Sequence, residues 1–528
     1  VLRFGLKASG ANGGLGYVAS VSHFETDGYR DHSAAERNLA NAKLTWRPDD
    51  SSTLTVVANS VALPTAQDPL GLTRAQFAAD PRGVDPAATT FDTRKSVDQT
   101  QLGVIYERRL DRVNSLRALV YSGHRNTEQF QSIPVATQNN PLHPGGVIAL
   151  GRDYRGTDLR WTAKTALAER PFTLVAGVAY DTLAEHRTGY QNFIGTTVGV
   201  QGALRRDENN DVSNFDQYLQ GSWQFAPRWT LNAGLRHSNV RFASSDGYVV
   251  GTNPDDSGSV RYGATLPVVG LMYAATESVH LYATAGRGFE TPTLNELAYR
   301  PNGATGLNLA LQASRSNNYE AGVKTRSERW GDFNVALFET GTRDEIVTLT
   351  NVGGRSTYQN AGATRRRGLE ASWSKAIVAN LQAQAAYTWL DARYSDSFEA
   401  CTATPCSAAN VTIPGGSRIP GVARSALYGA LAWAPPEGWR AGIEGRVLSR
   451  VYVNDANSDA ASGYAIASAN LGYVARLGPW ELTGFGRVDN LFARTYAGSV
   501  IVNEGNGRYF EPAPGRTWAA GVSVAYTF

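Results

Sequence analysis

The chain has 528 residues and a formal net charge of +3, and charged residues make up 18% of it against a typical figure of about 25%. It contains 54 Gly, 11 Trp and 24 Tyr but only 1 Met, a composition that favours strands and turns. No run of about 18 apolar residues occurs, which excludes a helical membrane span but not a β-barrel, whose apolar face is hidden in alternation. The small charge gives no argument for a nucleic-acid partner, and no linker divides the chain, so we expect one domain over residues 1–528.

Alternating segments occur in pairs throughout the chain. In residues 229–236 the expected apolar face holds Trp229, Leu231, Ala233 and Leu235. Turn-forming residue pairs predict tight connections at Pro48-Asp49, Pro227-Arg228, Glu437-Gly438 and Gly478-Pro479. The expected long polar segments are 62–96, 131–147, 189–212, 243–259, 288–315 and 395–419.

Short turns that alternate with long loops are typical of an outer-membrane barrel, in which the turns are periplasmic and the loops extracellular. We therefore predict an all-β fold, a transmembrane antiparallel β-barrel in the bacterial outer membrane. This chain should supply about 21 strands, the first over Val1–Ser9 and the last over Gly515–Phe528. Because bacterial single-chain barrels use even strand numbers, we expect about 22 strands in the whole barrel, with a gap of one strand between these two segments. The chain opens without Met or a signal peptide, so we expect the front of the protein to be missing.

The last segment predicts the side of the barrel that meets lipid. Trp518, Tyr526 and Phe528 fall on one face of an extended strand, opposite Thr517 and Thr527. An ordinary strand of a soluble sandwich could show the same pattern. An aromatic C-terminal residue in this register resembles the assembly signal of outer-membrane barrels. That resemblance implies the barrel assembly machinery, outer-membrane lipid and lipopolysaccharide as partners.

Two cysteines, Cys401 and Cys406, lie in a polar stretch. They could be half of a zinc site, but there is no second cysteine pair and no histidine in that stretch. We therefore favour a disulfide that closes an extracellular loop, which implies an oxidising compartment.

No pattern in the sequence predicts catalysis. The histidines are scattered, and the zinc-protease, serine-hydrolase and phosphate-loop motifs are absent. We expect neither enzyme activity nor a bound cofactor or metal.

Several motifs resemble TonB-dependent receptors. They are Val488-Asp489-Asn490-Leu491-Phe492, Tyr496, Pro514-Gly515-Arg516-Thr517, Arg287 to Thr293 with Asn295-Glu296-Leu297, Asn360-Ala361-Gly362 and Gly368-Leu369-Glu370. The resemblance implies a 22-stranded barrel with an N-terminal plug and a TonB box, driven by the TonB–ExbB–ExbD complex. The sequence departs from the family because the plug, the TonB-contacting segment and the first barrel strand are absent from it.

A narrower set of motifs is similar to the receptors that import pyrroloquinoline quinone, a group formerly described as probable siderophore receptors. These motifs are Gly28 to Ser33, Gln129 to Pro134, Gly202 to Asp207, Gly286 to Arg300, Arg418 to Gly421 and Tyr496 to Arg516. The implied ligand is a small anionic quinone with several carboxylates. A ferric siderophore would draw on similar basic and aromatic loops, and a passive porin or surface adhesin is the rival from another class.

Recognising carboxylates on a planar ring requires guanidinium forks and aromatic rings. The candidate ligand-binding residues in the expected loops are Arg187, Tyr190, Arg205, Arg206, Arg287, Tyr299, Arg300, Arg508 and Tyr509. For any single one of them, a solvated loop charge is the better interpretation. Arg205, Arg206 and Arg508 are the strongest candidates, and strand alternation predicts that only one of the adjacent pair faces the lumen.

Overall fold

The computed structural model describes residues 1–352, 355–400 and 410–528, and these residues form one antiparallel sheet of 21 strands. The strands of this sheet are β1 (Leu2–Asn12), β2 (Leu15–Thr26), β3 (Ala35–Asp49), β4 (Ser52–Gln67), β5 (Arg94–Arg109), β6 (Asn114–Phe130), β7 (Val147–Leu167), β8 (Arg170–Tyr190), β11 (Leu204–Ala226), β12 (Trp229–Asp246), β13 (Gly258–Ala274), β14 (Val279–Glu290), β15 (Ser314–Thr325), β16 (Asp332–Arg343), β19 (Thr364–Val378), β20 (Leu381–Tyr394), β23 (Ser425–Trp433), β24 (Gly438–Leu448), β27 (Tyr464–Leu477), β28 (Trp480–Asp489) and β31 (Thr517–Tyr526). The all-β prediction and the predicted strand count are confirmed.

Short hairpins and helices occupy the long loops. The hairpin strands are β9 (Phe193–Ile194), β10 (Thr197–Val198), β17 (Ile346–Val352), β18 (Arg355–Asn360), β21 (Phe398–Ala400), β22 (Val411–Ile413), β25 (Val451–Tyr452), β26 (Ala460–Ala461), β29 (Ala497–Val500) and β30 (Phe510–Pro512). The helices are α1 (Arg74–Ala79), α2 (Pro86–Thr90), α3 (Leu294–Leu297) and a 3-10 turn at Val135–Asn139. No helix among the described residues is long and apolar enough to cross a membrane.

Each strand of the sheet pairs with the next sheet strand along the chain, from β1 with β2 to β28 with β31. Among the described residues no ladder joins β1 to β31, so these strands are the two edges of the sheet. With 21 strands in antiparallel order, the first and last run in the same direction and cannot form an antiparallel pair. The two segments are therefore not paired neighbours, the predicted width of one strand between them stays a prediction, and hydrogen bonds among the described residues do not form the predicted closed barrel.

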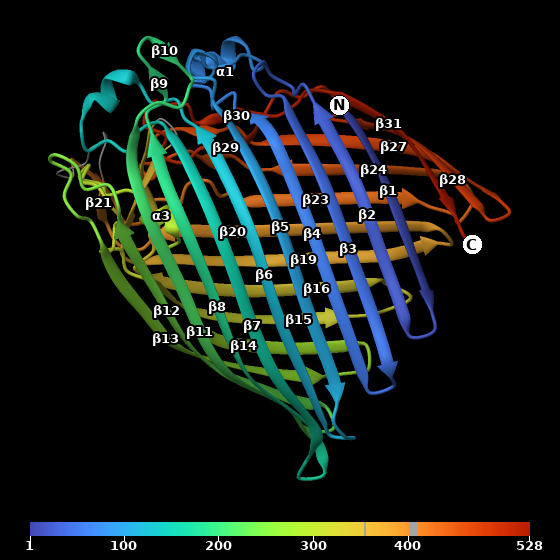
Figure 1. Cartoon of the computed structure of the whole chain (residues 1–528). Coiled ribbons are helices and arrows are strands. Elements are labelled where there is room, and N and C mark those ends of the chain that lie inside the picture. The colour runs from blue at the N-terminus through green and yellow to red at the C-terminus, as the bar shows by residue number, and fades with distance from the viewer. Residues whose placement is uncertain (353–354, 401–409) are drawn as a thin grey trace.

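The turns and the long loops are sorted to opposite ends of the strands (Figure 1). Figure 1 shows α1, α3 and the hairpin strands β9, β10 and β21 gathered at one end. At the other end β7 and β8 are joined by Ala168 and Glu169, both with positive φ, as a two-residue hairpin turn with matching twist requires. The predicted turns at Pro227-Arg228 and Gly478-Pro479 are confirmed, whereas the predicted turn at Pro48-Asp49 lies within β3.

The strands extend further into the loop end than the sequence predicts. The segment predicted as a loop over residues 189–212 contains the start of β11, so Arg205 and Arg206 lie on a strand. Arg187 and Tyr190 end β8, and Arg287 lies on β14. Above the apolar band both faces of a strand are polar, so the alternation that marks a strand disappears while backbone pairing continues.

Large apolar side chains cover the outer face of the sheet, and polar side chains fill the other face. Leu219 and Leu235 pair across β11 and β12 and are 52% and 50% exposed. Near the short turns the aromatic rings pair, as Trp229 with Tyr273 at 4.5 Å between centroids and Trp480 with Tyr526 at 4.7 Å. This arrangement matches a lipid-facing band with an aromatic girdle.

Contacts between the first and last loops show that the sheet curls round on itself. Leu72, in the loop after β4, exchanges two backbone hydrogen bonds with Phe510 of β30, at 2.7 and 3.0 Å. Arg74 also forms an ion pair with Asp459, 385 residues away. Small apolar clusters stabilise the loops, one of them around Leu297, Leu307 and Leu311. Cys401 and Cys406, with their predicted disulfide, lie outside the described residues.

Candidate functional site

Three arginines surround the ring of Tyr299 at the loop end of the sheet. The guanidinium carbons of Arg187, Arg206 and Arg355 lie 5.3, 5.6 and 4.8 Å from the ring centroid. Each position suits a cation–π contact. Arg187 lies near the end of β8, Arg206 lies near the start of β11, Arg355 begins β18, and Tyr299 follows α3. The structure therefore brings together three predicted residues and Arg355, which the sequence did not reveal.

Local sequence fixes the position of Tyr299. Thr293 caps α3 by accepting a hydrogen bond from the backbone N–H of Glu296, whose side chain in turn accepts from the N–H of Thr293, a capping box. Leu294 and Leu297 are buried in the apolar cluster beneath the loops. Polar contacts at its N-cap and apolar contacts of its buried leucines therefore fix the position of the helix. Because Tyr299 follows the helix, its position is fixed as well.

The partners of the three arginines differ. Arg206 donates to both carboxylate oxygens of Glu208, at 2.6 and 2.9 Å. Arg187 donates to the hydroxyl of Tyr299 at 3.0 Å. Arg355 donates to Nε2 of His143 at 2.8 Å and to the carbonyl oxygen of Gly145. Among the described residues, only one of the three has a carboxylate in an ion pair.

The nearby carboxylate of Glu185 does not neutralise the charge of Arg187. Glu185 acts electrostatically on Arg187, but it is paired with Arg152. Arg187 and Arg206 are nearly buried, at 3% and 6% exposure. Burying a guanidinium without a paired anion is costly, so the cluster has an excess of positive charge that a bound anion would neutralise.

The charges around Tyr299 and His143 shift both pKa values downward. Burial alone would raise the pKa of Tyr299, but the charges of Arg187, Arg355 and Arg206 outweigh it and hold the pKa below its ordinary value of 10.0. Burial lowers the pKa of His143 from 6.5 to about 3, and Arg355 adds to the effect. His143 is therefore neutral and can accept the hydrogen bond from Arg355.

A cavity of about 180 Å³ lies beside this cluster. Its lining includes Arg206, Tyr299 and Arg355, together with Arg205 and Arg300. The Nε–H groups of Arg205 and Arg355 are buried, and neither has a hydrogen-bond partner in the described part of the chain. These two side chains therefore carry donors that nothing in the described part of the chain satisfies.

The prediction that Arg205 and Arg206 point to opposite sides is wrong, because both line this cavity. The register of β11 against β8 shifts between Leu204 and Arg206, so the strict alternation of side chains breaks at Arg205. Arg205 is anchored by the carbonyl oxygens of Gln138 at 3.3 Å and Asn140 at 2.6 Å.

A larger cavity of about 610 Å³ lies on the inner wall of the sheet. Arg236 lines it as an ion pair with Asp216, Arg152 lines it while paired with Glu185, and Phe289 supplies an aromatic surface. Residues 291–295 line this cavity, while residues 298–300 and 303–306 line the smaller one. The two cavities thus share one loop as a wall.

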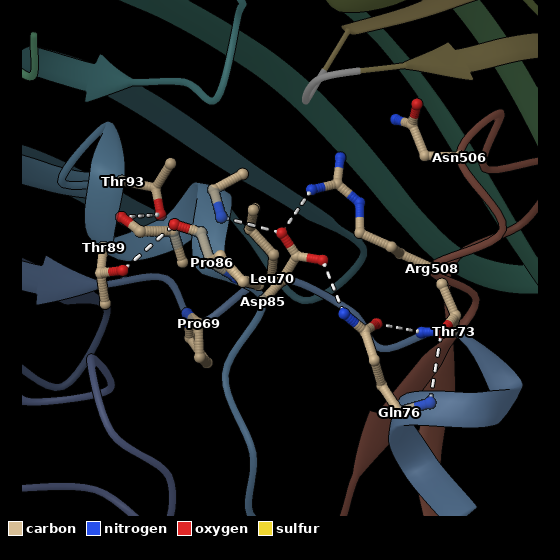
Figure 2. Close-up of polar contacts among 12 residues, drawn as sticks. Pro69, Leu70, Thr73, Gln76, Asp85, Pro86, Thr89, Thr93, Asn506 and Arg508 are labelled. Atoms are coloured by element: carbon tan, nitrogen blue, oxygen red, sulfur yellow. Dashed lines mark hydrogen bonds and ion pairs between the residues drawn. The ribbon is translucent and has the colours of Figure 1, made fainter.

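Arg508, a third strong candidate, lies in a different cluster (Figure 2). Its guanidinium is paired with Asp85 at 3.3 Å and with Glu504 at 3.3 Å, and the residue is 8% exposed. Figure 2 shows the Asp85 carboxylate between Arg508 and Gln76, which donates to it at 3.2 Å. With two carboxylates beside it, this guanidinium joins the last loop to the first.

The remaining candidates lie apart from Tyr299 or serve other contacts. Arg300 pairs with Asp256 at 3.7 Å at the edge of the smaller cavity, and Tyr509 packs on Phe510 at 6.2 Å between centroids. Tyr190 pairs through its backbone with β7 and β11. Arg287 is exposed on β14. Trp518 and Tyr526 on β31 are 75% and 50% exposed, and Phe528, just beyond its end, is 86% exposed, as an outward-facing terminal strand requires.

The described residues include no group of three or more His, Cys, Asp or Glu that could hold a metal ion.

The position of one acceptor of Arg355 explains in part why the sequence did not identify this residue as part of the site. Gly145 has φ of 85°, and a Cβ there would clash with the backbone of Tyr190, so only glycine fits where its carbonyl meets Arg355. No local sequence pattern connects Arg355 with His143, which lie 212 residues apart.

Residues 22–491 match the family model described as TonB dependent receptor-like, beta-barrel. The chain is 23% identical to the metal-pseudopaline receptor CntO of Pseudomonas aeruginosa over 521 residues, 92% of this chain and 68% of that protein. It is 23% identical to the ferrioxamine B receptor of Salmonella typhimurium over 394 residues, 69% of this chain and about half, 51%, of that receptor.

Solved structures share the fold. The siderophore receptor PiuA of Acinetobacter baumannii superposes with a TM-score of 0.80 at 14% identity, over 99% of this chain and 79% of that one. The ferric citrate transporter FecA gives 0.78 at 17% identity, over 99% and 75%. These relatives are receptors and transporters rather than enzymes, which confirms the prediction of no enzyme activity. Because the family model covers most of its length, the chain belongs to the TonB-dependent receptor β-barrel family of outer-membrane proteins.

Proposed function

We propose that this chain is the barrel of a receptor that imports a metal ion held in a small anionic chelate, using energy from the TonB–ExbB–ExbD complex. Relatives named as metal-pseudopaline, ferrioxamine B and siderophore receptors support this proposal. Outer-membrane lipid, lipopolysaccharide and the barrel assembly machinery are the further partners that such a barrel would meet.

The incompletely neutralised arginines around Tyr299 are the observation that carries the proposal. A carboxylate that leaves water recovers its solvation from charged donors, and each charge-assisted hydrogen bond contributes about 1.5 to 3 kcal/mol. Two or three such contacts would supply most of a micromolar affinity. The larger cavity, at about 610 Å³, falls within the roughly 300 to 1,000 Å³ that small-molecule sites occupy and would take the body of the chelate.

Pyrroloquinoline quinone is the second candidate ligand. The motifs from Gly28 to Ser33 and from Tyr496 to Arg516, with four others, favour it through their resemblance to receptors of that group. It carries several carboxylates on a planar ring, so the same arginines would bind the acids and an aromatic side chain would stack on the ring.

Uptake by the full-length receptor in a strain lacking its own copy separates the two ligands. Entry of radiolabelled iron or zinc as siderophore complexes, abolished when TonB is deleted, would support the chelate. Growth rescue by external pyrroloquinoline quinone in a strain that cannot make it would support the quinone. If cells that carry the receptor in their outer membrane show neither uptake of the siderophore complexes nor growth rescue by the quinone, both assignments are overturned.

Variants connect uptake to the site. Arg206→Ala should reduce uptake about tenfold or more, and Arg206→Lys should recover only part, because Lys lacks the guanidinium fork. Arg287→Ala is the matched control, since Arg287 is exposed and lines neither cavity. A passive porin would instead give a large steady current in a planar bilayer without any requirement for TonB.

A further inference from the structure

We infer that the cavity of about 180 Å³ beside Tyr299 is a subsite for the carboxylate groups of a small organic anion, an inference that rests on the proposed function where the carboxylate is an arm of the chelate. The volume of this cavity limits the size of the ligand that it can hold. A liquid water molecule takes about 30 Å³, so the cavity has room for roughly six waters or one small dicarboxylate. A whole chelate needs about 300 Å³ or more and belongs in the larger cavity.

The donors set the chemistry of the ligand. Arg205 and Arg355 each present a buried Nε–H without an acceptor, and neither forms an ion pair with a carboxylate among the described residues. Both guanidiniums are already held by other contacts, Arg205 by two backbone carbonyls and Arg355 by His143 and Gly145. They are therefore positioned before any ligand arrives, which lowers the entropic cost of binding.

The surrounding carboxylates leave this charge available. Asp256 is paired with Arg300, and Glu208 with Arg206. Asp246 accepts hydrogen bonds from the backbone N–H groups of Tyr248 at 2.8 Å and Asp256 at 3.2 Å. An anion that enters beside Arg205 and Arg355 would neutralise two guanidiniums that no carboxylate pairs among the described residues, whereas a neutral or cationic molecule would leave both charges unpaired.

Calorimetry on the full-length receptor in detergent micelles tests this site, with succinate as the probe and sodium chloride holding the ionic strength constant. We expect saturable binding of succinate and none of succinamide, which has the same shape without charge. Arg355→Gln should weaken succinate binding about tenfold or more, since it removes a charge-assisted donor. Arg74→Gln is the control, because Arg74 lies at the same loop end of the sheet but pairs with Asp459 outside the cavity.

A second variant and a second probe complete the test. Arg205→Lys keeps the charge but lacks Nε–H, and it should weaken binding severalfold even if Arg355→Gln fails to fold. Succinate monobenzyl ester distinguishes the source of the carboxylate: binding of both compounds indicates the arm of a larger molecule, and binding of succinate alone indicates a free small anion.

If neither succinate nor its monobenzyl ester binds the folded receptor, or if wild type and both variants bind succinate equally, the inference is overturned. The result is separate from the transport proposal, because succinate binding is measured whether or not any chelate is taken up.

Discussion

Two clusters of buried arginine lie among the loops, and they are neutralised in different ways. Arg508 meets two carboxylates, from Asp85 and Glu504, one in the first long loop and one in its own. Around Tyr299 three arginines share one paired carboxylate, that of Glu208, and rely on a ring, a histidine and a carbonyl for the rest.

The difference separates a structural role from a binding role. A guanidinium with enough carboxylates is satisfied without a ligand and holds two loops together. A guanidinium with spare donors is satisfied only when an anion arrives. Residue type and burial alone would have placed Arg508 and Arg187 in the same class.

The largest effect is expected from Asp85→Ala, which leaves Arg508 buried with one carboxylate instead of two. Removing one partner of a buried pair should cost about 3 kcal/mol in the free energy of local opening. Hydrogen exchange at the amides of Leu72 and Phe510, which bond across this junction, measures it. Asp31→Ala, at an exposed loop position, is the control. If Asp85→Ala leaves the protection of these two amides from hydrogen exchange unchanged, this cluster does not hold the two loops together.

Glu208→Gln should strengthen anion binding, whereas Asp85→Ala should weaken a contact between loops. It removes the carboxylate that neutralises Arg206 while keeping the shape of the side chain, so the affinity for succinate should rise about tenfold, or about 1.4 kcal/mol. Glu504→Gln makes the same change in the other cluster and should leave succinate affinity unchanged. Equal responses to the two substitutions would mean that the clusters do not differ as described.

Acid should open the loop that carries His143. Because its folded pKa is lowered to about 3, the unfolded or opened loop binds the proton first as the pH falls below 6.5. Stability that is present above pH 6.5 is therefore lost toward pH 3, with a slope of at most about 1.4 kcal/mol per pH unit. Between pH 6.5 and 5.5 we expect a loss of about 1 kcal/mol in the local opening energy of residues 131–146.

Hydrogen exchange at the amide of Gln131, which bonds to the carbonyl of Gly146, reports this opening. His143→Asn, which keeps a polar side chain without a titrating ring, should abolish the pH dependence in this range. A variant as acid-sensitive as the wild type would exclude His143 as the cause.

The smallest effect is expected from Tyr299→Phe, which keeps the ring and loses only the hydroxyl that accepts from Arg187, at a cost of about 0.5 to 1.5 kcal/mol. The lowered pKa of Tyr299 gives this change a pH signature. As the pH rises through the folded pKa toward 10.0, the wild type should gain stability over the variant, because the phenolate forms more readily in the folded state.

The same phenolate would neutralise the arginines, so succinate affinity of the wild type should fall over that pH range, while that of Tyr299→Phe stays constant. Thermal melting and calorimetry at several pH values between 8 and 10 measure the two trends. Parallel curves for the two proteins would show that the arginines do not act on Tyr299.

The sequence predicted the sheet well because strand alternation and turn residues are local signals. Residues 229–236 alternate as they do because one face meets lipid, and Pro227-Arg228 begins that strand with a turn. Strand ends were less predictable, since Arg187 and Arg206 continue strands above the apolar band, where alternation carries no information.

The candidate site could be predicted only in part. Arginines and tyrosines near strand ends were visible as residue types, so Arg187, Arg206 and Tyr299 were found. Arg355 was missed because its contacts reach residues more than 200 positions away. The carboxylates that satisfy Arg508 were equally hidden, since Asp85 lies 423 residues from it.

The loop that follows β14 forms a wall of both cavities: residues 291–295, which include the first turn of α3, line the larger one, and residues 298–300 and 303–306, which follow α3, line the smaller one. A ligand that displaces α3 from the larger cavity would also move Tyr299, and with it the ring on which three guanidiniums rest. Thermodynamic linkage then makes the effect reciprocal: whatever factor a ligand in the larger cavity imposes on anion affinity, the anion imposes on that ligand. A four-residue helix would thus let a cell-surface receptor respond to a second solute as it binds the first.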